Sequence, residues 1–354
     1  MLSYEQGVIR PPSEASSILI RVTRNCPWNQ CVFCPAYKGT KFSRRTVEEV
    51  KGDIDNMALA YGVHGRSITT AFLQDADSLL LPTADLLEIL RYLKLKFPAV
   101  NRVTSYARGN SMKRKSVEEY RQLMEAGLTR VHTGMESGSA RVLQLIQKGT
   151  SPETMVEGGR RVKESGISLS EYIMPGVGGR ALTQEHAKET ATLLNRIEPD
   201  FIRVRTFAMH PQSPMQRMVQ EGTFVPMADD EIAREIRLLV ATLREMHSYF
   251  SCADFSLNLL MQVDGYLDEK KEAMLRELDR FLALSKEQRQ AYSLLRRTSP
   301  GIPYPLDVVD DKRTMEKILP EIKKLESEGP DGFDRYIWML MTYQLPQPQT
   351  DNWT

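Results

Sequence analysis

Short apolar segments alternate with amphipathic helical segments from the N-terminal region to beyond residue 200. The apolar segments span 17–24, 67–74, 100–107, 128–135, 167–174 and 201–208, and helical patterns that follow strands include 83–97, 183–196 and 229–246. Each helix carries the chain back to the start of the next strand, so such an alternation forms a parallel sheet. The sequence therefore predicts an α/β fold, a partial (β/α)6 TIM-like barrel.

Local capping signals mark several helix starts. Thr46, Ser116 and Ser285 each stand three residues before a glutamate or glutamine, which is the capping-box pattern. Ser151 precedes a proline at the first helical position. These four positions predict where helices begin.

Beyond the sixth unit, from about residue 252, the strand pattern is lost. Helical patterns cover 270–284 and 286–296, and proline-rich breaks follow. We predict a core barrel at 1–250 and a helical C-terminal extension at 251–354. The extension covers the barrel, contributes to the substrate site, or forms a small separate domain.

The strands also indicate what lies inside the barrel. Arg203 and Arg205 share one face of the sixth strand, and apolar residues share the other. Two charges facing outward would be buried against apolar helices at a high cost, so we expect them to face the lumen. In the fifth predicted strand, the polar residues Ser170 and Tyr172 likewise share one face, although Glu171 falls on the opposite face. A polar lumen predicts an opening that holds a polar ligand.

Three of the four cysteines, Cys26, Cys31 and Cys34, form a C-x4-C-x2-C motif in the loop after the first strand. Barrel enzymes keep their chemistry at this end of the sheet, and thiolates suit iron–sulfur clusters or zinc. Structural zinc takes four ligands, but Cys252 is over two hundred positions away and His64 is thirty residues downstream. The pattern favours a [4Fe–4S] cluster with one open iron over a zinc knuckle completed by a distant residue.

The motif resembles that of the radical S-adenosylmethionine superfamily, in which an aromatic such as Phe33 precedes the last cysteine. The spacing is one residue longer than the commoner C-x3-C-x2-C, and the resemblance covers about residues 17–246. It implies a [4Fe–4S] cluster on the three cysteines and S-adenosylmethionine at the open iron. An external one-electron reductant of the flavodoxin or ferredoxin type would trigger cleavage to methionine and a 5′-deoxyadenosyl radical.

The resemblance also implies positions that contact the cofactor. Gln74, Asp75 and Asp77 end the second strand where the family has a glycine–glycine–glutamate motif, so backbone carbonyls there would receive the cofactor's amino group. Glu136 and Ser137 fall in the segment that reaches the ribose hydroxyls.

On the adenine side, the resemblance points to the glycine turn at Gly176 and to the strand around Val204, which carries Arg203 and Arg205. The turn also matches the dinucleotide fingerprint G-x-G-x-x-A. That fingerprint normally opens its domain, whereas four strands precede Gly176.

Several residues keep two interpretations. Arg203 and Arg205 bind an anionic substrate or the cofactor carboxylate, or else they pair with Glu136 or Glu171, because buried charges must be paired.

His132 and His210 are structural or relay protons. Cys252 is a buried small side chain or a catalytic thiol. No other residue is singled out as catalytic.

The formal net charge of +1 gives no sign of a nucleic-acid surface. Neither a membrane span nor a secretory signal is recognised, so we expect a cytoplasmic protein. The resemblance implies an oxygen-sensitive enzyme. No cobalamin-binding or RNA-binding domain is recognised either. We therefore predict a radical enzyme that takes hydrogen from a small molecule, with no membrane or nucleic-acid partner; the alternative is a non-catalytic iron–sulfur or zinc protein.

Overall fold

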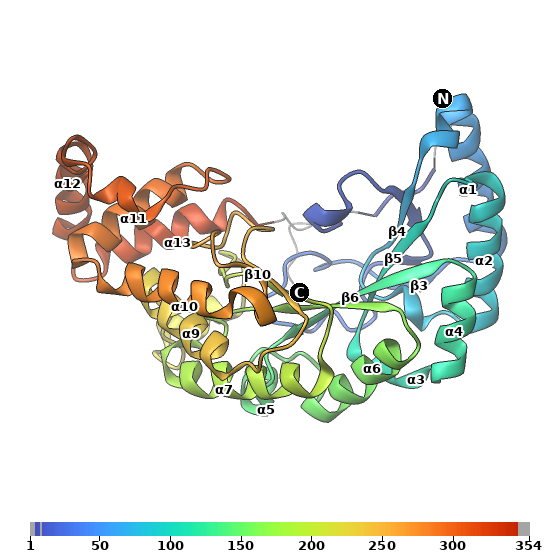
Figure 1. Ribbon diagram of the computed structural model, residues 1–354, viewed down its shortest axis with the longest axis horizontal. Helices are drawn as coiled ribbons and strands as arrows, with labels where there is room; N and C mark the ends of the chain where they lie inside the picture. The colour runs from blue at the N-terminus through green and yellow to red at the C-terminus, as the bar shows by residue number, and fades with distance from the viewer. Residues whose placement is uncertain (1–3, 8, 346–354) are drawn as a thin grey trace.

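The computed structural model describes residues 4–7 and 9–345. An eight-stranded sheet, ordered β1-β4-β5-β6-β7-β8-β9-β10, forms its centre, and it is parallel except between β9 and β10. The strands are β1 (Ile18–Arg21), β4 (Thr70–Gln74), β5 (Arg102–Ala107), β6 (Leu128–Glu136), β7 (Ser168–Ile173), β8 (Phe201–Val204), β9 (Tyr249–Ser251) and β10 (Asp264–Tyr266). β1 and β10 lie at opposite edges, so the barrel is open, and the helices form an arc outside it (Figure 1). The predicted partial β/α barrel is confirmed.

The structure corrects the sequence prediction at both ends of the sheet. The first predicted strand divides into β1 and β2 (Thr23–Arg24), and β2 pairs antiparallel with β3 (Ser43–Arg44). At the other end, β10 shows that the strand pattern does not stop at residue 252. β9 and β10 have three residues each, which is too short for a period-two pattern to stand out.

Nine α-helices occur between β3 and β9 in the described chain. They are α1 (Val47–Tyr61), α2 (Thr83–Lys96), α3 (Gly109–Arg114), α4 (Val117–Glu125), α5 (Ala140–Leu145), α6 (Pro152–Glu164), α7 (Gly179–Ile197), α8 (Met215–Gln220) and α9 (Asp229–Thr242). The capping boxes at Thr46 and Ser116 are both formed, and Ser151 caps α6. α7 starts four residues before the predicted position, directly in the glycine turn, and α9 ends four residues early.

The C-terminal part is helical, as predicted. It contains α10 (Leu267–Ala283), α11 (Lys286–Thr298), α12 (Lys312–Ser327) and α13 (Gly332–Thr342), together with the 3-10 turn η4 (Leu306–Val309). Ser285 forms its capping box with Gln288. α12 and α13 were not predicted, because Pro320 inside α12 and the prolines nearby are typical of breaks rather than helices. These helices lie at the opposite end of the arc from α1 and α2 (Figure 1).

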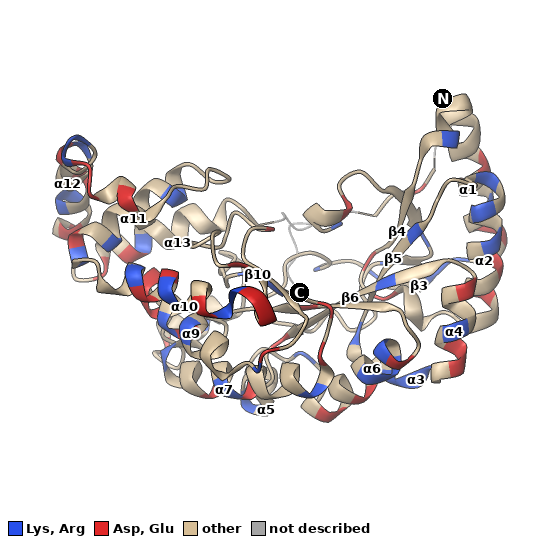
Figure 2. Ribbon diagram, viewed as in Figure 1, with Lys and Arg blue, Asp and Glu red and all other residues tan. Residues whose placement is uncertain are grey.

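The two faces of the sheet differ in character. The outward face packs under the helices and carries apolar side chains such as Ile20, Leu73 and Val131, all fully buried. The inward face carries a line of rings, in which Tyr106 contacts Phe72 at 5.0 Å and His132 at 5.9 Å between centroids. Charged residues gather on the outer helices (Figure 2). Among the described residues, no helix combines the length and apolar character needed to cross a membrane.

Candidate functional site

The three clustered cysteines lie in the loop between β2 and β3, beyond the carboxyl end of β1. Asn25 and Asn29 have φ angles of 66° and 47°. Asparagine tolerates this left-handed conformation better than most residues. The chain therefore turns sharply on both sides of Cys26, while the β2–β3 pair closes the base of the loop.

Hydrogen bonds fix this loop against the segment that follows α5. The Val32 N–H donates to the Ile146 carbonyl at 3.1 Å, and Trp28 Nε1 donates to the Gln147 carbonyl at 2.7 Å. Ser213 Oγ donates to the Val32 carbonyl at 2.6 Å. Residues distant in sequence thus hold the cysteine loop in place.

The three cysteines themselves are half-buried. Burial raises the pKa of Cys34, and it raises the pKa of Cys31 to about 12, partly opposed by the nearby Lys148 ammonium. The Asn29 N–H donates to Cys26 Sγ at 3.4 Å. Each thiol lies within electrostatic range of the other two. Three soft, sheltered donors in one loop fit an iron–sulfur cluster.

Asp75, at the end of β4, is engaged by the protein itself. Its carboxylate accepts from Arg21 Nε at 2.7 Å, from the Asn25 N–H at 3.1 Å and from the Tyr37 hydroxyl at 3.5 Å. Asp75 has a φ of 71°, which turns the chain at this point. Its side chain therefore ties β4 to the start of the cysteine loop.

The other two predicted residues in this segment differ from each other. Asp77 accepts from Ser111 Oγ at 2.6 Å and from the Arg108 N–H at 3.3 Å, and burial raises its pKa to about 6. Gln74 is fully buried, yet neither atom of its amide has a hydrogen-bond partner among the described residues. An orphaned amide at this edge of the sheet fits the binding of a polar cofactor group.

Glu136 ends β6 and pairs with a lysine that the sequence analysis did not identify. Lys148 Nζ lies 2.8 Å from Glu136 Oε1 and 5.8 Å from the centre of the Phe33 ring. A Cβ at Gly134 would come within 2.3 Å of the Glu136 carboxylate, so a side chain there would displace this pair from its present position. Lys148 follows α5 in a loop at the carboxyl edge of the sheet, where functional residues concentrate, and this was the available signal.

Ser137 leads into a buried chain of polar side chains. His186 Nδ1 lies 2.8 Å from Ser137 Oγ, and His186 Nε2 lies 3.6 Å from Glu235 Oε1. Glu235 Oε1 accepts from the Gly176 N–H at 2.7 Å. Burial lowers the pKa of His186 to about 4 and raises that of Glu235 to about 7. These side chains connect the two segments predicted to hold ribose and adenine. His186 and Glu235 lie inside α7 and α9, where no sequence motif marked them.

Arg203 lies on the inward face, as predicted, and is paired. Its Nε donates to Ser170 Oγ at 2.9 Å, and its guanidinium forms an ion pair with Asp254. One interpretation of the sequence paired Arg203 with Glu136 or Glu171. That prediction is wrong, because the partner of Arg203 is Asp254. Burial raises the pKa of Glu171 to about 8, and its two oxygens have no hydrogen-bond partner among the described residues.

Arg205, two residues further on, differs from Arg203. Its guanidinium lies 5.7 Å from the Phe255 ring centre, close to Tyr106 and Tyr172, and makes no ion pair within the described chain. Val204, between the two arginines, packs its side chain in the apolar core instead. The three consecutive residues therefore alternate between lumen and core.

The remaining candidates have structural surroundings. His132 Nε2 lies 3.5 Å from Glu14 Oε1, and burial lowers the His132 pKa to about 4. His210 Nδ1 accepts from the Gln212 N–H at 3.2 Å. Cys252 is 1% exposed and packs in the core, which confirms the prediction of a buried small side chain.

Among residues 4–7 and 9–345, no group of three or more His, Cys, Asp or Glu side chains is arranged to hold a single metal ion. An open parallel barrel with thiols, a lysine–glutamate pair and an orphaned amide at the carboxyl ends of its strands defines a β/α-barrel enzyme. The family model described as the Radical SAM superfamily matches residues 20–194, so the chain contains a domain of that superfamily. Enzymes of this superfamily use a [4Fe–4S] cluster and S-adenosylmethionine.

A solved structure shares the fold, and curated proteins match parts of the chain at low identity. The fold is similar to that of the cobalamin-dependent S-adenosylmethionine radical enzyme OxsB, with a TM-score of 0.52, 16% identity, and coverage of 93% of this chain and 58% of that chain. A tRNA uridine(34) acetyltransferase of Methanocaldococcus infernus is 26% identical over 117 residues, which are 33% of this chain and 22% of that protein. The uncharacterized methyltransferase PH0819 of Pyrococcus horikoshii is 24% identical over 196 residues, 54% of this chain and 40% of that protein. The chain thus spans less than half the length of these curated relatives.

Proposed function

We propose that Cys26, Cys31 and Cys34 bind the [4Fe–4S] cluster and that S-adenosylmethionine binds beside it at the carboxyl edge of the sheet. When bound, these groups supply a 5′-deoxyadenosyl radical that removes a hydrogen atom from a substrate. The observation that carries the proposal is the cysteine loop itself, in which three sheltered thiols are held by bonds to Ile146, Gln147 and Ser213.

The protein's own residues bind and orient the cofactor in this proposal. The orphaned amide of Gln74 and the backbone at Asp75 and Asp77 receive its amino group. Lys148, next to Cys31, supplies a cation for the cofactor's carboxylate, and Glu136 holds that cation in place.

The nucleoside end of the cofactor is assigned to the next strands. Glu136 and Ser137 face the ribose, and the turn at Gly176 and the backbone at Val204 flank the adenine. Phe33 shields the cysteine loop. These assignments are supported by the position of the residues at the carboxyl edge of the sheet, where barrel enzymes keep their active sites.

We further propose a small-molecule substrate with an anionic group. The half-buried Arg205 guanidinium lacks a carboxylate partner among the described residues, and a cation in such a position calls for an anion. An external flavodoxin- or ferredoxin-type reductant, oxygen sensitivity and a cytoplasmic location belong to the same proposal. A tRNA substrate, which the name of one relative suggests, is the competing outcome.

Anaerobic reconstitution tests the proposed site. We expect the full chain to bind about four iron atoms and, with dithionite and S-adenosylmethionine, to release 5′-deoxyadenosine. Cys34→Ala should lose the cluster signal in electron paramagnetic resonance and all cleavage. Cys252→Ala is the matched control and should keep both, since Cys252 lies in the apolar core.

Zinc in place of iron, or a cluster that does not respond to S-adenosylmethionine, would contradict the proposal and favour a non-catalytic metal protein. Full activity of Cys34→Ala would contradict the ligand assignment alone. Once cleavage is established, faster 5′-deoxyadenosine formation with tRNA than with small carboxylates would overturn the proposed substrate class.

A further inference from the structure

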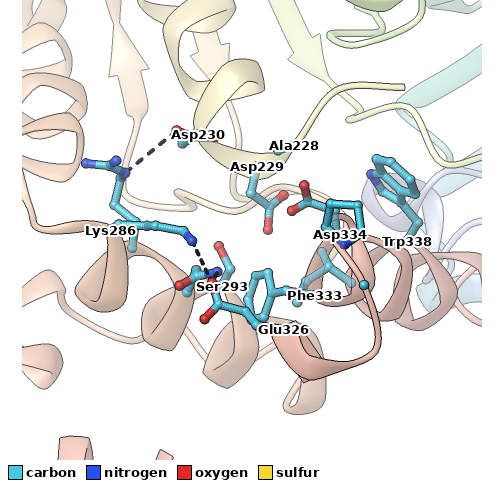
Figure 3. Close-up of a pocket in the computed structure, with 14 residues that line it drawn as sticks. Ala228, Asp229, Asp230, Lys286, Ser293, Glu326, Phe333, Asp334 and Trp338 are labelled. Carbon is cyan, nitrogen blue, oxygen red and sulfur yellow. Dashed lines mark hydrogen bonds and ion pairs between the residues drawn. The ribbon is translucent and has the colours of Figure 1, made fainter. Parts of the chain in front are cut away.

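A cavity of about 350 Å³ lies far from the cysteine loop in the fold, between the N-terminus of α9, the helix α11, and the turn from α12 into α13. None of its lining residues belongs to the cofactor site described above. Its volume is within the range of small-molecule sites, about 300–1,000 Å³. Figure 3 shows the side chains that surround it.

Most of the charges that line the cavity are already paired. Glu326 accepts from Lys286 Nζ at 2.6 Å, and Asp230 lies 3.7 Å from Arg289 Nε. The Asp229 carboxylate forms an ion pair at 2.5 Å with Arg297, which is fully buried. These partners account for both cationic side chains in the lining.

Asp334, in the first turn of α13, is the exception. Its carboxylate has no hydrogen bond and no ion pair within the described chain, and it lies beside the Asp229 carboxylate (Figure 3). Burial and the nearby carboxylates of Asp229 and Asp230 raise its pKa to about 6. The cavity therefore presents one uncompensated negative group.

A second, independent polar group is also without a partner. Ser293 on α11 is 2% exposed, lines the cavity, and makes no hydrogen bond within the described residues. A buried hydroxyl normally bonds to something. Here the open side of Ser293 is the cavity itself, so a ligand is the partner that its position allows.

The walls indicate what kind of ligand fits. Phe333 and Trp338 both line the cavity, and Trp338 Nε1 donates to the Met227 carbonyl at 3.0 Å, which fixes the indole ring. Aromatic faces attract organic cations. The volume is also about ten times the space of one water molecule, which is more than an inorganic ion needs.

We propose that this cavity binds a small organic cation with an ammonium or guanidinium group, which pairs with Asp334, donates a hydrogen bond to the Ser293 hydroxyl, and packs against Trp338. The proposal is independent of the proposed radical chemistry. It assigns the C-terminal helices a ligand-binding role of their own.

The binding should depend on pH in a defined direction. Asp334 is faced by Asp229, Asp230 and Glu231 of α9, by Arg180 of α7 and by Lys286 of α11. A cation binds the ionised carboxylate, so affinity is full only well above pH 6 and falls as the pH drops through 6. At pH 5 about one-tenth of the Asp334 side chains are ionised, which predicts roughly tenfold weaker binding than at pH 8.

Isothermal titration calorimetry on the anaerobically purified full chain tests the proposal, with agmatine and 1,4-diaminobutane as probes. We expect a dissociation constant below about 1 mM for at least one of them at pH 7.5 and low salt, and no heat with 1,4-butanediol. Asp334→Asn should weaken binding about tenfold or more, and Ser293→Ala should weaken it a few-fold. Asp331→Asn, at the N-cap position just before the same helix and paired with Arg335, is the matched control.

The folded state of Asp334→Asn is checked by its melting temperature. Relief of the unpaired carboxylate should raise the melting temperature at pH 7.5 but not near pH 4, where Asp334 is already protonated. Cys34→Ala should bind the probes as well as the parent chain does, which separates this site from the cofactor site. Binding of Mg²⁺ but of neither amine, or amine binding that Asp334→Asn leaves unchanged, would overturn the proposal.

Discussion

At the scale of single residues, Lys148 is the side chain that tertiary structure adds to the candidate site. It lies near both Cys31 and Glu136, in a loop where no sequence motif singles it out. Its neighbour Gly149 would meet the Trp28 ring at 2.3 Å if it carried a Cβ, so the loop packs closely on the cysteine segment. The side chain is therefore held where a cofactor carboxylate would need a cation.

We expect Lys148→Met to lower the affinity for S-adenosylmethionine at least tenfold, because a charge-assisted hydrogen bond is lost while the side-chain volume is kept. Equilibrium dialysis of the reconstituted protein measures the affinity, and iron content is measured in parallel. Lys113→Met, on the surface beside Glu157, is the control and should change neither quantity. Unchanged affinity in Lys148→Met would remove this lysine from the proposed cofactor site.

The sequence predicted those site residues that belong to a motif of neighbouring positions. The cysteines, Glu136 and Ser137 are found at strand ends that periodicity alone locates. The partners of Arg203 could not be predicted in the same way. Asp254 follows β9, a strand too short to recognise, and lies fifty-one positions along the chain.

At the scale of elements, the helices α7 and α9 do more than cover the sheet. His186 and Glu235 project from them and connect the end of β6 to the turn after β7. Both side chains are buried in the low-dielectric interior. A polar group that loses its partner there lowers the stability of the folded protein.

We expect His186→Phe to destabilise the protein by roughly 1–3 kcal/mol, because Ser137 loses a buried hydrogen-bond partner and Glu235 loses a polar neighbour at 3.6 Å. Urea unfolding measures the change. His247→Phe is the matched control, since His247 is exposed and pairs only with Asp268 and the Tyr266 ring, and we expect it to cost below about 0.5 kcal/mol. Equal stability of the two variants would show that the chain of polar side chains contributes nothing.

At the scale of the whole molecule, the C-terminal helices and the barrel share one apolar core. The buried ion pair between Arg297 of α11 and Asp229 of α9 crosses between the two parts at 2.5 Å. Arg297 also donates to the Leu257 carbonyl at 2.6 Å. The division into a barrel at 1–250 and an extension at 251–354 remains a prediction, while β10 carries the sheet itself to Tyr266.

Removing one partner of a buried ion pair leaves an uncompensated charge, so we expect Arg297→Met to cost about 3–5 kcal/mol of unfolding free energy. Arg237→Met is the control, because its pair with Asp279 is exposed and is expected to contribute under about 1 kcal/mol. Denaturant titration of both variants gives the comparison. A loss below about 1 kcal/mol in Arg297→Met would mean that the buried pair is not a major link between the two parts.

The sequence by itself determined the parallel β/α order, the helix starts at Thr46, Ser116 and Ser285, and the cysteine motif, because each is written in neighbouring residues. Tertiary structure alone decided the partners: Lys148 for Glu136, His186 for Ser137, and the cavity around Asp334. Periodicity and caps are local properties of the chain, whereas ion pairs and cavities depend on which distant segments the packed core brings together.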